Sequence, residues 1–267
     1  MSVETAGAGT TRFAPIDWRG TPQRIEYEWV GDARSAVPTV VFLHEGLGSV
    51  AMWKDFPRRF CAAHGLSGFV FSRPGYGRST PRPANERWAV DFMHRQAEEV
   101  LPALFAATGI DRPWLFGHSD GGSIALLHAA RHEVAGVVAI VPHLFVEPLS
   151  ITSIAQARAA YEGGEVRAGL ARYHDDPDSA FYGWYDAWLD PAFAHWNIER
   201  ELATIAAPVL AIQGEDDEYG TLAQIRAIAA AVPGTRLLAL PDCGHSPHRD
   251  CPEALMREAG RFILAAR

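Results

Sequence analysis

The stretch GHSDGG at residues 117–122 decides how this sequence is interpreted. It follows the apolar run 112–116, which predicts a strand, and precedes residues 123–131, whose small and aliphatic side chains predict a helix. Gly-x-Ser-x-Gly between a strand and a helix is typical of a sharp turn that exposes the serine. The glycines let strand and helix pack closely, and backbone N–H groups at the helix start favour developing negative charge. We therefore expect Ser119 to be a nucleophile.

A serine hydroxyl needs a base to become a good nucleophile. His245 follows the apolar run 235–240, which predicts a strand, and lies in the segment PDCGHSP at residues 241–247. Gly244 gives this loop the freedom to turn the imidazole toward the edge of the sheet. We expect His245 to be the base, with His248 as the alternative.

An acid that orients the base is expected between the serine and the histidine in the chain. The segment QGEDDE at residues 213–218 follows the apolar run 208–212, which predicts another strand. We favour Asp217, three residues after Gly214, with Asp216 next and Glu147 as a more distant alternative. The chosen aspartate would hold His245 in the right tautomer and stabilise its imidazolium form.

The oxyanion of a tetrahedral intermediate needs two backbone donors. One is expected from the N–H of Asp120, the residue after the nucleophile. The other is expected from the segment HEGLGS at residues 44–49, which follows the predicted strand 38–43. Gly46 and Glu45 are both candidates for the second donor, and the alternative is an ordinary glycine-rich turn.

The chain alternates apolar, β-branched runs with amphipathic helical runs, such as 91–108. This alternation predicts an α/β fold with a mostly parallel, doubly wound sheet. After the run 134–141 it is interrupted by residues 143–204, which carry helical patterns and many aromatic side chains but no clear strand. We expect a helical cap at 143–204, inserted after the sixth core strand, and a core formed by 1–142 and 205–267. Residues 1–15 are small and polar, and we expect them to be frayed.

Composition excludes several classes of function. The net charge is −8 over 267 residues, and without a long basic run nucleic acid is not expected as a partner. No window of about 18 apolar residues predicts a membrane span, and the N-terminus does not look like a secretory signal, so a cytoplasmic location is expected. No metal-ligand cluster and no Gly-x-Gly-x-x-Gly motif is present, so we expect neither metal nor cofactor. We interpret Cys61, Cys243 and Cys251 as reduced thiols without a catalytic role.

Taken together, these motifs resemble the α/β-hydrolase superfamily over nearly the whole chain. The resemblance is carried by GHSDGG, by SRPGYGRS at residues 72–79, by GEDD at residues 214–217 and by the pair Gly244-His245. SRPGYGRS resembles the common D-x-x-G-x-G-x-S segment of that family, which implies a role in shaping the core beside the site. Haloalkane dehalogenases and epoxide hydrolases of this fold carry aspartate at the elbow, so Ser119 argues against both.

One departure from the family pattern concerns the oxyanion turn. The family often has His-Gly there, whereas this chain has His44-Glu45-Gly46. An ionised Glu45 that pointed inward would oppose the oxyanion. We expect its carboxylate to point away, or to bind His44 or a polar group of the substrate.

The cap supplies candidate pocket residues. Trp184 and Trp188 are four residues apart, so on a helix they share one face; simple packing is the alternative. His143 and Tyr219 are further candidates for this pocket, with a structural role as the alternative for each. Such a pocket suits a small-molecule substrate with an apolar or aromatic part. We therefore expect hydrolysis of a small ester, thioester or lactone through an acyl-enzyme on Ser119.

Three alternatives use the same fold differently. A meta-cleavage type carbon–carbon hydrolase would use the same three residues and would need a group to hold a carboxylate, for which Arg158, Arg167 or Arg172 in the cap are candidates. A small-molecule receptor would bind without turnover. A cofactor-free oxygenase would consume oxygen even without Ser119. The oligomeric state has no signal in the sequence.

Overall fold

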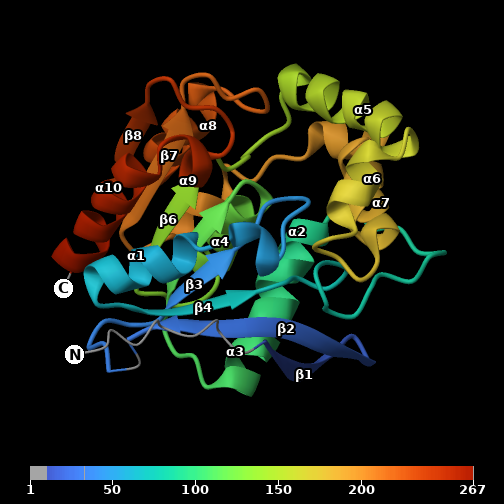
Figure 1. The fold of residues 1–267 in the computed structure, drawn as a ribbon. Coiled ribbons are helices and arrows are strands. Elements are labelled where there is room, and N and C mark those ends of the chain that lie inside the picture. The colour runs from blue at the N-terminus through green and yellow to red at the C-terminus, as the bar shows by residue number, and fades with distance from the viewer. Residues whose placement is uncertain (1–10, 33, 267) are drawn as a thin grey trace, which may run out of the picture.

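The computed structural model describes residues 11–32 and 34–266, which form one eight-stranded sheet with helices on both faces (Figure 1). The strands lie in the order β1-β2-β4-β3-β5-β6-β7-β8. From β4 to β8 neighbours are parallel, whereas β2 runs antiparallel to β1 and β4. This confirms the predicted, mostly parallel doubly wound sheet. The strands are β1 (Arg12–Trp18), β2 (Thr21–Gly31), β3 (Val40–Leu43), β4 (Ser67–Phe71), β5 (Trp114–His118), β6 (Gly136–Ile140), β7 (Val209–Gly214) and β8 (Arg236–Leu240).

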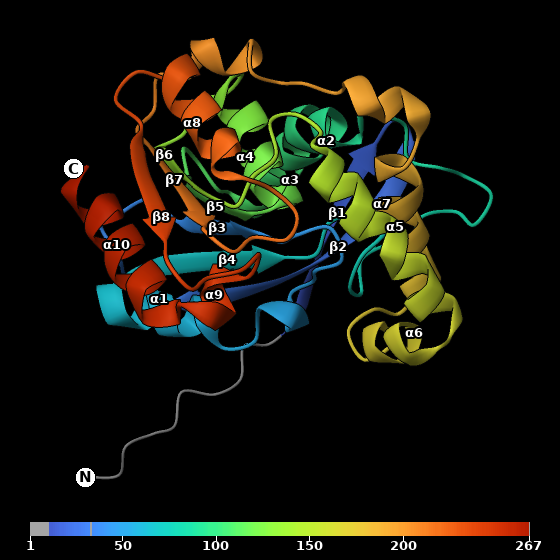
Figure 2. The same cartoon turned by 90° about the horizontal axis from the view of Figure 1, so that it is seen from above.

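Two layers of helices cover the sheet because its central strands are apolar on both faces. In β3, Val41 and Leu43 pack into one core, and Val40 and Phe42 pack into the core on the other face. Figure 2 shows α1 and α10 on one side of the sheet and α3, α4 and α8 on the other. The helices are α1 (Phe56–His64), α2 (Phe92–Arg95), α3 (Leu101–Thr108), α4 (Asp120–Ala129), α5 (Pro148–Glu162), α6 (Glu165–Leu170), α7 (Pro177–Trp188), α8 (Leu222–Ala231), α9 (Pro247–Asp250) and α10 (Pro252–Ala265).

Two local expectations are corrected. Residues 12–15 are not frayed, because they belong to β1, which pairs along its length with β2 and buries Ala14 and Ile16. The expectation that residues 1–10 are frayed concerns residues outside the described part of the chain. The single helix expected over 91–108 is divided by a wider π-helical turn at Gln96–Val100. Pro102 follows directly, and its ring clashes with a regular α-helical turn, which accounts for the interruption.

Residues 143–204, called the cap below, contain α5, α6 and α7 and two short 3-10 turns, Pro191–His195 and Glu201–Thr204. Phe145 forms an antiparallel bridge with Asn197, so residues near the two ends of this segment lie side by side. Figure 1 shows α5, α6 and α7 gathered at one end of the molecule. No helix in the described part of the chain is long and apolar enough to cross a membrane.

The parallel strands all end at the same edge of the sheet, and side chains that follow them meet there. His44 follows β3, Ser119 follows β5, and the loops after β7 and β8 carry Asp217 and His245. The topology therefore brings residues far apart in sequence to one site.

Candidate active site

The turn between β5 and α4 presents Ser119 at this edge of the sheet. Its backbone angles, φ 54° and ψ −121°, are rare for a non-glycine residue and are expected of a nucleophile elbow. A Cβ atom at Gly117 would lie 2.2 Å from the carbonyl oxygen of Gly121, and one at Gly121 would lie 2.2 Å from that of Leu43. The two glycines are therefore required by the close approach of strand and helix.

Ser119, His245 and Asp217 are joined in a chain of hydrogen bonds. Ser119 Oγ lies 2.9 Å from His245 Nε2. His245 Nδ1 lies 2.8 Å and 3.0 Å from the two carboxylate oxygens of Asp217. A carboxylate accepts from Nδ1–H, which leaves Nε2 able to accept the serine proton. The structure thus brings together the three residues expected from the sequence.

The carboxylate of Asp217 is buried but well supplied with donors. Gln213 Nε2 donates to Oδ2 at 2.6 Å, and the N–H of Tyr219 donates to Oδ1 at 2.8 Å. Burial acts to raise the pKa of Asp217, but the hydrogen bond and charge of His245 and the N–H of Tyr219 hold that pKa below its ordinary value. The aspartate is therefore ionised when it faces His245.

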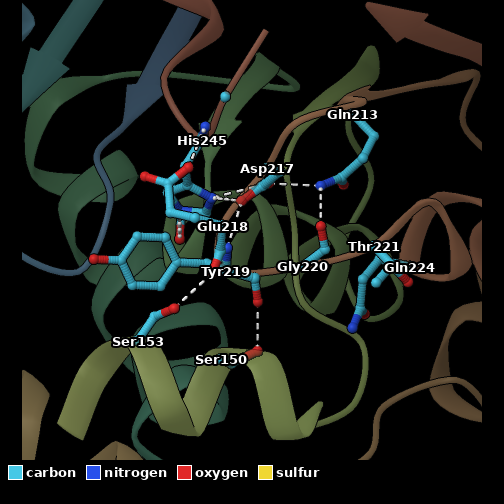
Figure 3. A network of polar contacts seen from close by, with 12 residues as sticks. Ser150, Ser153, Gln213, Asp217, Glu218, Tyr219, Gly220, Thr221, Gln224 and His245 are labelled. Atoms are coloured by element: carbon cyan, nitrogen blue, oxygen red, sulfur yellow. Dashed lines mark hydrogen bonds and ion pairs between the residues drawn. The ribbon is translucent and has the colours of Figure 1, made fainter. Parts of the chain in front are cut away.

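The loop that carries Asp217 is anchored to the cap. Ser150 Oγ on α5 donates to the carbonyl oxygen of Tyr219 at 2.5 Å, and Ser153 Oγ donates to that of Glu218 at 2.6 Å (Figure 3). Figure 3 also shows Asp217 between His245 and Gln213. Helix α5 thus supports the loop that orients the base.

The alternatives to these residues are placed elsewhere. Asp216 is exposed, and its carboxylate makes no hydrogen bond to a described residue. Glu147 accepts from Thr221 and Gln224, so it fixes the start of α8. The ring of His248 packs against Trp53, at 5.1 Å between ring centroids. None of the three alternatives contacts Ser119 or replaces Asp217 beside His245.

The peptide bond between Glu45 and Gly46 has a fixed orientation. The carbonyl oxygen of Glu45 accepts from His44 Nδ1 at 2.7 Å, from Arg73 Nη2 at 2.8 Å and from the N–H of Gly48 at 3.1 Å. In a trans peptide the N–H points opposite to the carbonyl, so the N–H of Gly46 points away from these three donors. Gly46 also lines the pocket with Ser119. These facts favour Gly46 over Glu45 as the second donor.

The side chain of Glu45 excludes one of the expected alternatives. It does not bind His44, because Oε2 lies 3.3 Å from His118 Nδ1, and the side chain lines the pocket beside Ser119. His44 uses its Nδ1 on the backbone of Glu45 instead, and its Nε2 accepts from the N–H of Arg73 at 3.0 Å. No local sequence pattern predicts this contact, because positions 45 and 118 are far apart in the chain.

A pocket of about 680 Å³ opens over Ser119 and His245. The four pocket residues expected from the sequence all line it, namely His143, Trp184, Trp188 and Tyr219. Burial lowers the pKa of His143 to about 3, followed by the charge of His245, so this ring is neutral near neutral pH. Sequence reasoning missed five lining residues: Leu47, His118, Ile154, Glu218 and Ser246. Glu218 adjoins the predicted acid and so had a positional signal.

A buried ion pair lies behind the nucleophile. Arg73 Nη2 is 3.7 Å from Asp120 Oδ2, and each side chain is only 1% exposed. Asp120 Oδ1 also accepts from Trp188 Nε1 at 3.1 Å. Burial raises the pKa of Asp120, while Arg73 and Trp188 oppose that rise. Arg73, in the segment SRPGYGRS, therefore contacts both the backbone of Glu45 and the side chain of Asp120, the residue after Ser119.

Several residues whose side chains could take part in chemistry lie away from this pocket. Cys61, Cys243 and Cys251 are free thiols, and none lines it. Of the cap arginines, Arg158 pairs with Glu162 and Arg167 pairs with Asp178; neither these nor Arg172 lines the pocket. Within residues 11–32 and 34–266, no cluster of three or more His, Cys, Asp or Glu is placed to hold a metal ion.

Comparison with known proteins agrees with this geometry. The pattern described as "Alpha/beta hydrolase family" matches residues 40–258. The 2-succinyl-6-hydroxy-2,4-cyclohexadiene-1-carboxylate synthase of Salmonella enteritidis is 26% identical over 85% of this chain and 94% of its own. Human serine hydrolase BPHL is 27% identical over 71% of this chain and 66% of its own.

Solved structures extend the likeness to the fold. The enol-lactonase of Burkholderia xenovorans superposes with a TM-score of 0.72 at 20% identity, covering 95% of this chain and 100% of the other. A thermophilic esterase from Thermogutta terrifontis gives 0.73 at 18% identity, covering 96% and 99%. Fold and site together define the class as a hydrolase of the α/β type. The chain belongs to the alpha/beta hydrolase family.

Proposed function

We propose that the protein hydrolyses a small ester, thioester or lactone through an acyl-enzyme on Ser119. The observation that carries this proposal is the hydrogen-bonded chain Ser119–His245–Asp217 at the floor of a pocket walled by Trp184 and Trp188. A serine hydroxyl that shares its proton with an oriented imidazole is suited to attack a carbonyl carbon.

The steps follow from the placement of these groups. Ser119 Oγ bonds to the carbonyl carbon while His245 Nε2 takes the hydroxyl proton, and Asp217 stabilises the resulting imidazolium. The carbonyl oxygen becomes an oxyanion facing the N–H groups of Asp120 and Gly46. When the oxyanion collapses, the bond to the leaving group breaks and His245 returns the proton to it. Water, deprotonated by His245, then attacks the acyl-enzyme and releases the acid and Ser119.

The charges of the residues that line the pocket favour hydrolysis of an ester, thioester or lactone. They do not favour cleavage of a carbon–carbon bond in a diketone that carries a carboxylate. A buried carboxylate on a substrate needs a cationic partner, but no lysine or arginine is among the described residues that line the pocket. The Salmonella relative is named for a product that carries a carboxylate, and among the described residues this pocket has no cationic partner for such a group either. A substrate without a negative charge and with an apolar or aromatic part suits this lining better.

The decisive test is turnover of p-nitrophenyl esters from acetyl to octanoyl by the wild type and by Ser119→Ala. We expect the wild type to turn over and Ser119→Ala to lose about 10⁴-fold or more in kcat, as in other enzymes that depend on a serine nucleophile. Ser67→Ala, at the start of β4 and away from the pocket, is the matched control and should keep activity. Equal rates in wild type and Ser119→Ala, or no turnover by either, would refute the proposal. Tight binding without turnover would support a receptor instead.

A further inference from the structure

Glu45 places a carboxylate in the wall of the pocket, where a hydrolase of this kind has reason to avoid negative charge. The side chain is 19% exposed and lines the same pocket as Ser119 and Gly46. An unpaired carboxylate beside the oxyanion would raise the energy of the transition state. A carboxylate at this position needs a partner that offsets its charge, and we expect it to have a role in binding or catalysis.

His118 is the protein partner of this carboxylate. Its Nε2 lies 2.7 Å from the carbonyl oxygen of His245, so Nε2 carries a proton and donates. Its Nδ1 lies 3.3 Å from Glu45 Oε2, and two lone pairs cannot face each other at this distance, so one proton is held between them. Burial acts to raise the pKa of Glu45, but the hydrogen bond and charge of His118 hold that pKa well below its ordinary value. Glu45 and His118 therefore share one proton, and the pair has no net charge.

The second oxygen of Glu45 has no partner in the protein. Oε2 contacts His118, whereas no hydrogen bond joins Oε1 to any described residue. The buried Arg73 donates to the backbone carbonyl of Glu45 rather than to its carboxylate. Oε1 is also not among the buried polar atoms that lack a partner, so it is accessible from the pocket. A fixed, ionised acceptor with one open oxygen is suited to bind a donor on a ligand.

Glycine at position 48 leaves room for the carboxylate. A Cβ atom at Gly48 would lie 2.5 Å from Glu45 Oε2. The neighbouring Gly46 is covered by Trp184, whose ring lies 2.3 Å from the place of a Cβ at residue 46. Glu45 thus lies where the oxyanion turn meets the wall of the pocket that holds Ser119.

We propose that Glu45 selects substrates that carry a hydrogen-bond donor, a hydroxyl or an ammonium group, close to the scissile carbonyl, and that His118 holds Glu45 in place for this. The inference rests on the proposed function and narrows it to hydroxy or amino esters. Glu218 also lines the pocket, but its Oε2 accepts from the N–H of His245 at 3.2 Å, and its side chain is exposed. Glu218 therefore offers a matched control.

The test compares selectivity within each variant. Phenyl esters of propionic, lactic, 2-methoxypropionic and alanine acyl groups differ only beside the carbonyl, and 2-hydroxyethyl and 2-methoxyethyl butyrate place the same change on the alcohol side. For the wild type we expect kcat/KM for a donor-bearing ester to exceed that of its methoxy analogue by about 10-fold or more, as for hydrogen bonds to charged groups. This ratio should fall to within about twofold in Glu45→Ala and remain high in Glu218→Gln.

The variants also separate the two kinds of donor. Glu45→Gln keeps an acceptor oxygen but loses the charge, so a preference for the ammonium ester should fall more than a preference for the hydroxyl ester. It also serves as the volume-matched variant if Glu45→Ala fails to fold, which the melting temperature reports. A flat ratio in the wild type on both sides of the ester, or a ratio that survives both Glu45 variants, would overturn the inference. No turnover of the propionate ester by the wild type would instead refute the proposed function.

Discussion

Asp217 shows how a single side chain sets the tautomer of its neighbour. It is one of several consecutive acids, and only its carboxylate hydrogen-bonds to the imidazole of His245, because the N–H of Tyr219 and the amide of Gln213 draw that carboxylate inward. Its neighbour Asp216 is exposed. The residue type and its offset from β7 could be predicted from the sequence, whereas the choice between adjacent acids depends on how the loop turns.

Replacing Asp217 should therefore damage catalysis more than folding. In Asp217→Asn the amide can donate toward His245 Nδ1 and favour the tautomer with a proton on Nε2, which cannot accept the proton of Ser119. We expect kcat for ester hydrolysis to fall by about 10³–10⁴-fold, with a similar circular dichroism spectrum. Asp216→Asn is the control and should retain activity. An equal loss in both variants would mean that the loop, and not the carboxylate at 217, is what matters.

At the scale of elements, the strands and helices of the core were largely predictable because their patterns are local. The runs 208–212 and 123–131 correspond to β7 and α4. β1 was not predicted, because only Ala14 and Ile16 are buried in it and its own apolar pattern is therefore weak. The strand is defined by its pairing with β2, which the sequence of β1 alone does not show. The contact between Glu45 and His118 joins residues 73 positions apart, and no local pattern reports such a pair.

Helix α7 sets the depth of the pocket. Trp184 is nearly buried and lies directly over Gly46. Trp184→Leu should open space beside the oxyanion turn and shift the optimum of kcat/KM toward longer acyl chains. The loss of stability should stay below the about 3–5 kcal/mol of a full truncation to alanine.

The same helix provides the control for this experiment. Tyr182 is half-buried on α7 but does not line the pocket. Tyr182→Leu should leave the order of preference among acetyl to octanoyl esters as in the wild type. A profile that is unchanged in Trp184→Leu would show that this indole does not limit the acyl group.

For the whole molecule, buried neutral histidines link stability to pH. Burial lowers the pKa of His128 to about 4, and those of His143 and His248 to about 3. The unfolded chain protonates such rings near pH 6.5, so it binds more protons than the folded protein as the pH falls below that value. Stability should fall steadily from about pH 6.5 to about pH 4.

His128 allows this prediction to be tested away from the active site. Its ring packs against Phe105 on the face opposite α1, and Nδ1 donates to the carbonyl oxygen of Ala97. Its share of the acid-induced loss is of order 3 kcal/mol. Urea unfolding at pH 7 and near pH 4 should show a smaller loss for His128→Asn than for the wild type. His195→Asn, at an exposed ring elsewhere on the molecule, is the control, and an identical pH dependence of all three proteins would contradict the prediction.

The order of the site residues along the chain has a consequence for synthesis. Ser119 and His245 are separated by 126 positions, and a protein leaves the ribosome from its N-terminus. A nascent chain can therefore form the elbow, and even much of the sheet, before the base has been translated. Until β8 adds to the edge of the sheet, Ser119 has no imidazole to take its proton, so reactivity toward acyl compounds should appear only after the loop that follows β8 has emerged.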